Sequence, residues 1–95
     1  MSAIVHITMI GGNCPVQVEG TIRSRRRGAQ KWAFYFRARG NHWSFQVGDD
    51  PICAPDWEYE EEYKPDEPYA AGWMTEQEAR AFLMQAANQW AEEQP

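Results

Sequence analysis

The sequence predicts an α+β fold: a single small domain in which an antiparallel sheet of four or five strands carries one C-terminal helix on its aromatic face. Two observations lead to this prediction. Apolar residues alternate with polar ones through three segments, as they do in strands with one buried and one solvated face. Near the C-terminus, a helix-capping sequence is followed by apolar residues at helical spacing. The 95 residues are enough for one modest core.

Four segments are expected to form the sheet. The alternation is most regular around Trp32, Phe34 and Phe36, and it continues through Trp43 and Phe45. The expected strands span residues 3–10, 15–22, 31–39 and 42–48.

The register of the central hairpin follows from its turn. If Gly40 and Asn41 form a two-residue turn, every apolar residue meets an apolar partner across the strands. The expected pairs are Ala38 with Trp43, Phe36 with Phe45, and Phe34 with Val47. A slip of one residue would place each of these side chains opposite the wrong face.

The C-terminal helix is expected over residues 76–91. Thr75 is the predicted N-cap, and Glu78 completes a capping box with it. The helix should turn an apolar stripe towards the sheet, formed by Ala79, Phe82, Leu83, Ala86 and Trp90. The aromatic residues assigned to the core are Trp32, Phe34, Phe36, Trp43, Phe45, Phe82 and Trp90.

Residues 49–73 are expected to form an irregular acidic loop, because four prolines bar a continuous helix or central strand. Residues 57–60 alternate and are the candidate for a fifth, short edge strand. A loop of this length in a small domain is usually functional or disordered, and its aromatic residues argue against disorder.

The charges of the chain are segregated. Residues 1–48 carry seven basic side chains against one acid, a net charge of +6. Residues 49–95 carry thirteen acids against two bases, a net charge of −11, which leaves −5 for the whole chain. A small fold must therefore present one basic and one acidic field, and such fields govern which partners a protein meets.

The acidic aromatic loop leads to our first hypothesis, a non-enzymatic module that binds a protein partner with a basic surface. Carboxylates would steer the approach and the aromatic rings would supply contact area. The residues assigned to this surface are Asp56, Trp57, Glu58, Tyr59, Glu60, Glu61, Glu62, Tyr63, Asp66 and Glu67. A natural target is a nucleic-acid-handling protein, whose basic groups would accept carboxylates in place of phosphates. The alternative interpretation is that the rings fold back onto the core and the acids only keep the loop soluble.

The basic half leads to the alternative hypothesis, a nucleic-acid-binding domain. Basic side chains around an exposed ring on a sheet are typical of single-stranded nucleic acid binding. The candidate residues are Arg23, Arg25, Arg26, Arg27, Lys31, Tyr35, Arg37 and Arg39. Only one ring falls on this face, and a net charge of −5 repels phosphates. The arginines are also expected to find partners in the chain's own acidic loop.

Enzymatic activity, a metal site and a membrane span are not expected. The sequence has no Gly-rich phosphate loop and no HExxH or GxSxG motif, and no cofactor is predicted. Its histidines and cysteines (His6, His42, Cys14 and Cys53) lack metal-ligand spacing. No signal peptide and no run of about 20 apolar residues is visible, so we expect a cytoplasmic protein. Whether it forms a homodimer stays open.

No motif places the chain in a family. Its build, a small acidic domain with one antiparallel sheet and one helix, is similar to that of bacteriophage-encoded inhibitors of host defence, anti-CRISPR proteins among them. The likeness is one of size and charge. It implies a viral protein that acts as an inhibitor, with an acidic surface that serves as a nucleic-acid mimic.

Overall fold

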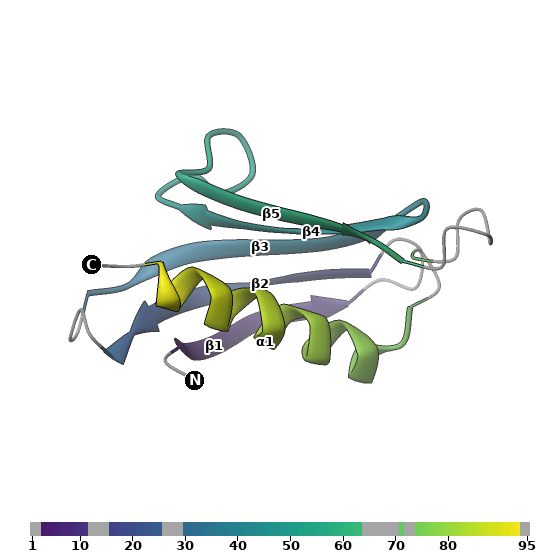
Figure 1. Cartoon of the computed structure of the whole chain (residues 1–95), viewed down its shortest axis with the longest axis horizontal. Helices are drawn as coiled ribbons and strands as arrows, with labels where there is room; N and C mark the ends of the chain where they lie inside the picture. The colour runs from purple at the N-terminus through teal and green to yellow at the C-terminus, as the bar shows by residue number, and fades with distance from the viewer. Residues whose placement is uncertain (1–2, 12–15, 26–29, 64–70, 72–73, 94–95) are drawn as a thin grey trace.

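Five antiparallel strands pair in the order in which they follow one another along the chain, and one helix packs against the sheet (Figure 1). The computed structural model describes residues 3–11, 16–25, 30–63, 71 and 74–93. The elements are β1 (Ala3–Gly11), β2 (Val16–Ser24), β3 (Trp32–Arg39), β4 (His42–Gly48), β5 (Trp57–Glu62) and α1 (Glu76–Glu92). The predicted α+β fold is confirmed, and the sheet has five strands.

The central hairpin has the predicted register. Phe36 lies opposite Phe45, and the pairs on either side also match apolar with apolar residues. Gly40 adopts a φ of 64° in the turn, a left-handed conformation that glycine reaches without strain. Turn chemistry and side-chain alternation thus favour the same pairing.

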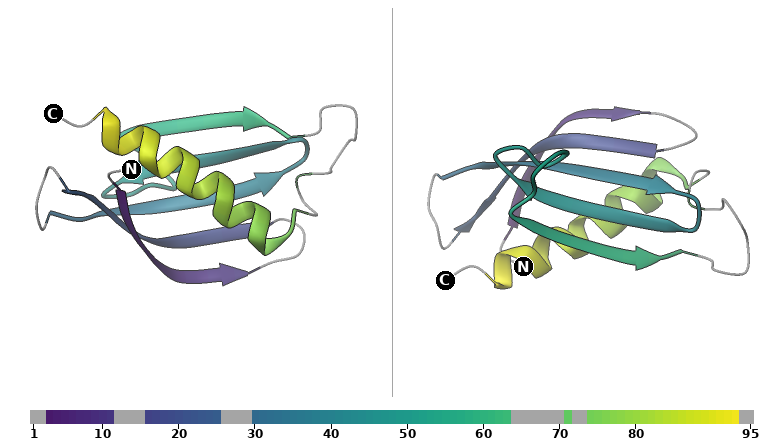
Figure 2. Two further views of the ribbon diagram at one scale, coloured as in Figure 1. Left: turned by 60° about the horizontal axis from the view of Figure 1, so that its bottom comes forward. Right: turned by 90° about the horizontal axis from the view of Figure 1, so that it is seen from above.

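The fifth strand lies within residues 49–73, the segment that was expected to be irregular because of its prolines. β5 pairs antiparallel with β4, from Val47 opposite Trp57 to His42 opposite Glu62. Strand β4 therefore lies between two neighbours, and β5 becomes one edge of the sheet (Figure 2). The other edge is β1, whose pairing with β2 is shifted by a bulge between Ile7 and Met9.

The core lies between the sheet and α1. Trp43 is almost fully buried, and its ring stacks on Phe36 of β3 and on Phe82 of α1, with ring centroids 5.6 and 5.2 Å apart. Trp32 and Phe82 are only partly buried but pack against the core. The rings of Trp32 and Trp90 contact each other edge to face. The aromatic residues assigned to the core thus lie in it or against it.

The start of α1 has the predicted capping box. The Thr75 hydroxyl accepts a hydrogen bond from the Glu78 backbone N–H at 3.1 Å, and the Glu78 carboxylate accepts one from the Thr75 N–H. These bonds satisfy two backbone donors that have no partner within the helix. Among the described residues, no helix is both long and apolar enough to cross a membrane.

Candidate functional site

The side of the sheet opposite α1, which we call the open face, carries candidate residues of both hypotheses, acidic ones on β5 and basic ones on β3. Successive residues of a strand point to opposite faces. Because Trp43, Phe45 and Val47 of β4 are buried on the core side, their neighbours belong to the open face. The polar side chains on the open face of the four strands from β2 to β5 belong to Gln17, Glu19, Thr21, Arg23, Tyr35, Arg37, Arg39, His42, Ser44, Gln46, Glu58, Glu60 and Glu62.

The acidic column of the open face is formed by Glu58, Glu60 and Glu62 of β5. All three side chains are exposed, and they repeat every second residue, about 6.6 Å apart along the strand. Residues 57–60 were the candidate for a short edge strand, and the structure extends that strand to Glu62. Glu61 lies on the other side of β5, beside the core, and does not belong to this column.

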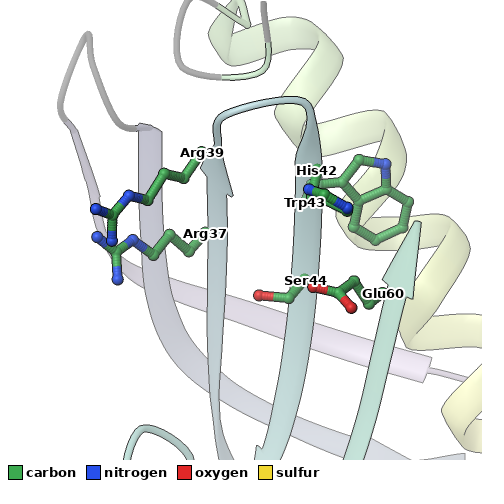
Figure 3. Close-up of a pocket in the computed structure, with 6 residues that line it drawn as sticks. All are labelled: Arg37, Arg39, His42, Trp43, Ser44 and Glu60. Carbon is green, nitrogen blue, oxygen red and sulfur yellow. The ribbon is translucent and has the colours of Figure 1, made fainter. Parts of the chain in front are cut away.

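The basic column is formed by Arg37 and Arg39 of β3, two strands away from β5. Arg37 shares a row with Ser44 and Glu60, and Arg39 shares the next row with His42 and Glu62. The two columns are therefore about 9.6 Å apart across β4. Figure 3 shows both arginine side chains extending away from β4 and Glu60. Within the described part of the chain, neither arginine forms an ion pair with an acid of β5.

A cavity of about 260 Å³ lies at these two rows (Figure 3). It is lined by Arg37, Arg39, His42, Trp43, Ser44 and Glu60. The Arg37 Nε atom is buried and has no hydrogen-bond partner among the residues that the structure describes. A buried donor of this kind calls for a partner such as water or an anion, although Glu60 places a negative charge at the same cavity.

Tyr35 does not provide the exposed ring that the nucleic-acid hypothesis requires. Its exposure is only 8%, although it lies on the open face. Its neighbour Gln46 donates a hydrogen bond to the Pro51 carbonyl at 2.8 Å, which holds the loop between β4 and β5 on this side of the sheet (Figure 2). The expectation of a fully solvated polar face is therefore wrong for the row that contains Tyr35 and Gln46.

The remaining basic candidates do not form one patch. Arg23 and Lys31 line a second cavity, whereas Arg39 lies at the other end of β3. An extended strand of that length separates the two groups by about 26 Å. Arg25 is exposed just after β2. Arg26 and Arg27, like the acidic candidates Asp66 and Glu67, lie outside the described residues.

The three aromatic residues assigned to the acidic binding surface, Trp57, Tyr59 and Tyr63, pack towards the core side rather than projecting into solvent. Tyr63 is buried at 8% exposure and donates a hydrogen bond to Glu78 of α1 at 2.8 Å. Trp57 and Tyr59 are partly buried against the core, and their rings stack nearly parallel, 6.2 Å apart. The expectation of freely exposed rings is wrong for Tyr63 and holds only in part for the other two.

Carboxylates hold the two rings of β5 in place. Trp57 Nε1 donates to Glu93 at 2.9 Å, and the Tyr59 hydroxyl donates to Glu61 at 2.6 Å. The hydrogen bond to Glu61, together with burial, raises the pKa of Tyr59. Hydrogen bonds from Gln89 and from Trp57 lower the pKa of Glu93, because they stabilise its ionised form.

The loop between β4 and β5 extends the acidic surface. Asp49, Asp50 and Asp56 are all exposed, and Asp50 accepts a hydrogen bond from the Cys53 backbone N–H at 3.3 Å. Among the described residues, no three His, Cys, Asp or Glu side chains are grouped as metal ligands would be.

Comparison of the chain with protein-family models, with curated proteins and with solved structures found no match.

Proposed function

We propose that the protein is a non-enzymatic module that binds a basic surface of a partner protein through the acidic column of β5. The observation that carries the proposal is the arrangement of Glu58, Glu60 and Glu62. They are exposed, regularly spaced on an edge of the sheet and, in the described part of the chain, not paired with the arginines of the same face. Their charges therefore remain available to a partner.

The surrounding charge favours this role. The C-terminal half of the chain carries a net charge of −11, and the β4–β5 loop, which directly precedes β5 in the chain, carries three exposed aspartates. An accumulation of one sign of charge accelerates the encounter with an oppositely charged partner and makes its rate depend on salt. We assign the binding role to this column and to the partly exposed rings of Trp57 and Tyr59.

In its most specific form, the proposal makes the protein an inhibitor of a nucleic-acid-handling protein. A row of carboxylates on an edge strand would act as a nucleic-acid mimic for a groove lined by Arg and Lys. The size and charge of the chain, which resemble those of phage-encoded inhibitors such as anti-CRISPR proteins, support this form of the proposal. The inhibitor would then act in the cytoplasm.

The test uses two double variants with the same change in charge. Glu60→Gln with Glu62→Gln neutralises two of the three acids of the acidic column, whereas Glu76→Gln with Glu92→Gln neutralises two exposed acids of α1. The control loses only a surface ion pair with Arg80, which contributes about 0 to 1 kcal/mol. Each protein is used for affinity capture from a lysate of the source cell, and the partner is identified by mass spectrometry.

Binding to the purified partner is then measured at several salt concentrations. We expect the β5 variant to associate at least about tenfold more slowly at low salt and with a flatter salt dependence, while the α1 variant behaves as the wild type. Equal binding by the wild type and the β5 variant would contradict the proposal.

The alternative function, nucleic acid binding, has one observation in its favour. The buried Nε of Arg37 has no partner in the described part of the chain, and Arg39 lines the same cavity. The burial of Tyr35 and the separation of the basic residues into two groups argue against it. Retention on heparin at low salt distinguishes the two functions.

A further inference from the structure

We infer that the partner binds as a sixth strand, antiparallel to β5 along its outer edge, through an extended segment in which basic and apolar residues alternate. This inference depends on the proposed function and specifies how the same surface binds and what chemistry its partner has. Three features of β5 support it: its backbone, its side chains and its difference from β1.

The backbone of β5 offers hydrogen-bonding groups along its outer edge. The Tyr63 N–H donates to the Asn41 carbonyl at 2.7 Å, and this pair continues the register of β4 with β5. In an antiparallel pair, residues that bond to the neighbouring strand alternate with residues that do not. Odd-numbered residues of β5 therefore bond to β4. Since β5 is an edge strand, Glu58, Glu60 and Glu62 direct their N–H and C=O groups outward.

The side chains of β5 define what an added strand must carry. Residues directly opposite one another in adjacent strands lie within about 5.5 Å, so the positions opposite the glutamates favour Lys or Arg. On the other face, the partly exposed rings of Trp57 and Tyr59 form a shelf next to the edge, in orientations held by Glu93 and Glu61. Apolar side chains of the added strand would pack on this shelf.

The two edges of the sheet are not equivalent. β1 contains a bulge between Ile7 and Met9 and has no acidic residue, whereas β5 pairs with β4 in an unbroken register. Bulges and charged side chains both protect edge strands from unwanted pairing. The glutamates of β5 would then repel a second β5, and a basic strand would be attracted by the same charges. The competing explanation is that the glutamates only protect the β5 edge from unwanted pairing. The experiment must distinguish this protection from the binding of a basic strand.

The probe is a capped eight-residue peptide of alternating Lys and Val, with three matched controls. One control has the same composition in two blocks. The other two carry N-methyl groups on the backbone, either at every Lys or at every Val. In the antiparallel arrangement, the residues opposite the glutamates bond to β5, so the N–H groups of Lys point to the protein and those of Val point away.

Binding is measured by fluorescence anisotropy of labelled peptides at low salt. We expect the Val-methylated peptide to bind within about threefold of the parent, and the Lys-methylated and block peptides at least about tenfold more weakly. Equal affinities for all four peptides would overturn the sixth strand and leave attraction by charge alone. In that case the proposed function, which depends on the charges of the acidic column and not on backbone pairing, would still stand.

Amide hydrogen exchange locates the binding. We expect the parent peptide to slow exchange at Glu58, Glu60 and Glu62 by at least about tenfold, with no change at β1. Unchanged exchange on β5 would overturn the inference. A second result would also overturn it: the wild type binds no peptide, and a variant with all three glutamates replaced by Gln self-associates. In that case the acids would serve only to protect the edge.

Discussion

Two glycines of the sheet are required for different physical reasons. Gly40 has a positive φ but open space around it, so Gly40→Ala should cost about 1 to 2 kcal/mol of backbone strain. At Gly20, a Cβ would collide with the His6 carbonyl of β1 and lie 2.9 Å from Phe34 Cε2. We expect Gly20→Ala to cost more than about 3 kcal/mol in urea denaturation, because the backbone of β1 must move.

Substitution by asparagine separates the two causes. Asparagine tolerates the left-handed conformation, so Gly40→Asn should recover part of the loss caused by Gly40→Ala. Gly20→Asn should be at least as harmful as Gly20→Ala. Similar behaviour of the two sites would contradict this assignment.

The pair formed by Tyr59 and Glu61 should be visible in an absorbance titration of the tyrosines. The hydrogen bond to Glu61 and burial raise the pKa of Tyr59, and the charge of Glu61 adds to the effect. Glu61→Gln should therefore lower this pKa towards its usual value of about 10. Subtracting the titration of Tyr59→Phe isolates the residue, and Glu62→Gln is the control because its side chain lies on the open face.

The sign of the associated pH effect follows from the direction of the shift. A pKa that is raised by folding contributes stability below the pKa of the unfolded tyrosine, and this contribution is lost as the pH rises through the folded value. Wild type and Glu61→Gln should therefore differ less in stability at strongly alkaline pH than just below pH ~10. A constant difference across that window would count against the Tyr59–Glu61 bond.

Burial of single polar residues was the least predictable property of the sequence. Tyr35 falls on the polar side of a regular alternation, and nothing local indicates that Gln46 would hold Pro51 on that face. Tyr63 is buried with a hydrogen bond to Glu78, which is fifteen positions away in the sequence. Both outcomes depend on contacts between segments, which alternation and turn chemistry do not encode.

At the scale of elements, the sequence predicted most of what the structure shows. The hairpin of β3 and β4 was predictable because its turn residues and its apolar alternation agree. β5 was recognisable as an edge strand from the alternation of Trp57, Glu58 and Tyr59, although four nearby prolines obscured its length. The outward direction of its backbone groups follows only from the observed register with β4.

The capping box gives a prediction for α1. Thr75→Ala removes the hydroxyl that accepts from the Glu78 N–H, and should lower the free energy of unfolding by about 1 kcal/mol. Thr75→Ser keeps the oxygen and should lose only a few tenths of a kcal/mol. Urea denaturation measures both. Equal losses for the two variants would show that the methyl group, and not the hydrogen bond, stabilises the start of the helix.

At the scale of the whole molecule, folding brings basic residues of the N-terminal half and acidic residues of the C-terminal half onto the same open face, where they form separate columns. The hairpin places Arg37 and Arg39 in the middle of the sheet, and the extra strand places the acids at its edge. The two columns are about 9.6 Å apart, close to the screening length of about 10 Å at 0.1 M salt. A charged ligand that approaches the arginines therefore meets the field of the glutamates as well.

This geometry predicts the behaviour of the protein on heparin, a polyanion. Lower salt strengthens the attraction of a polyanion to the arginines, but it equally strengthens repulsion by the acidic column. We expect the wild type to pass through at low salt. A variant with Glu58, Glu60 and Glu62 replaced by Gln should be retained, and adding Arg37→Gln and Arg39→Gln to it should abolish retention. If the wild type is retained and the two arginine substitutions alone release it, the basic column is the binding site and nucleic acid binding becomes the better assignment.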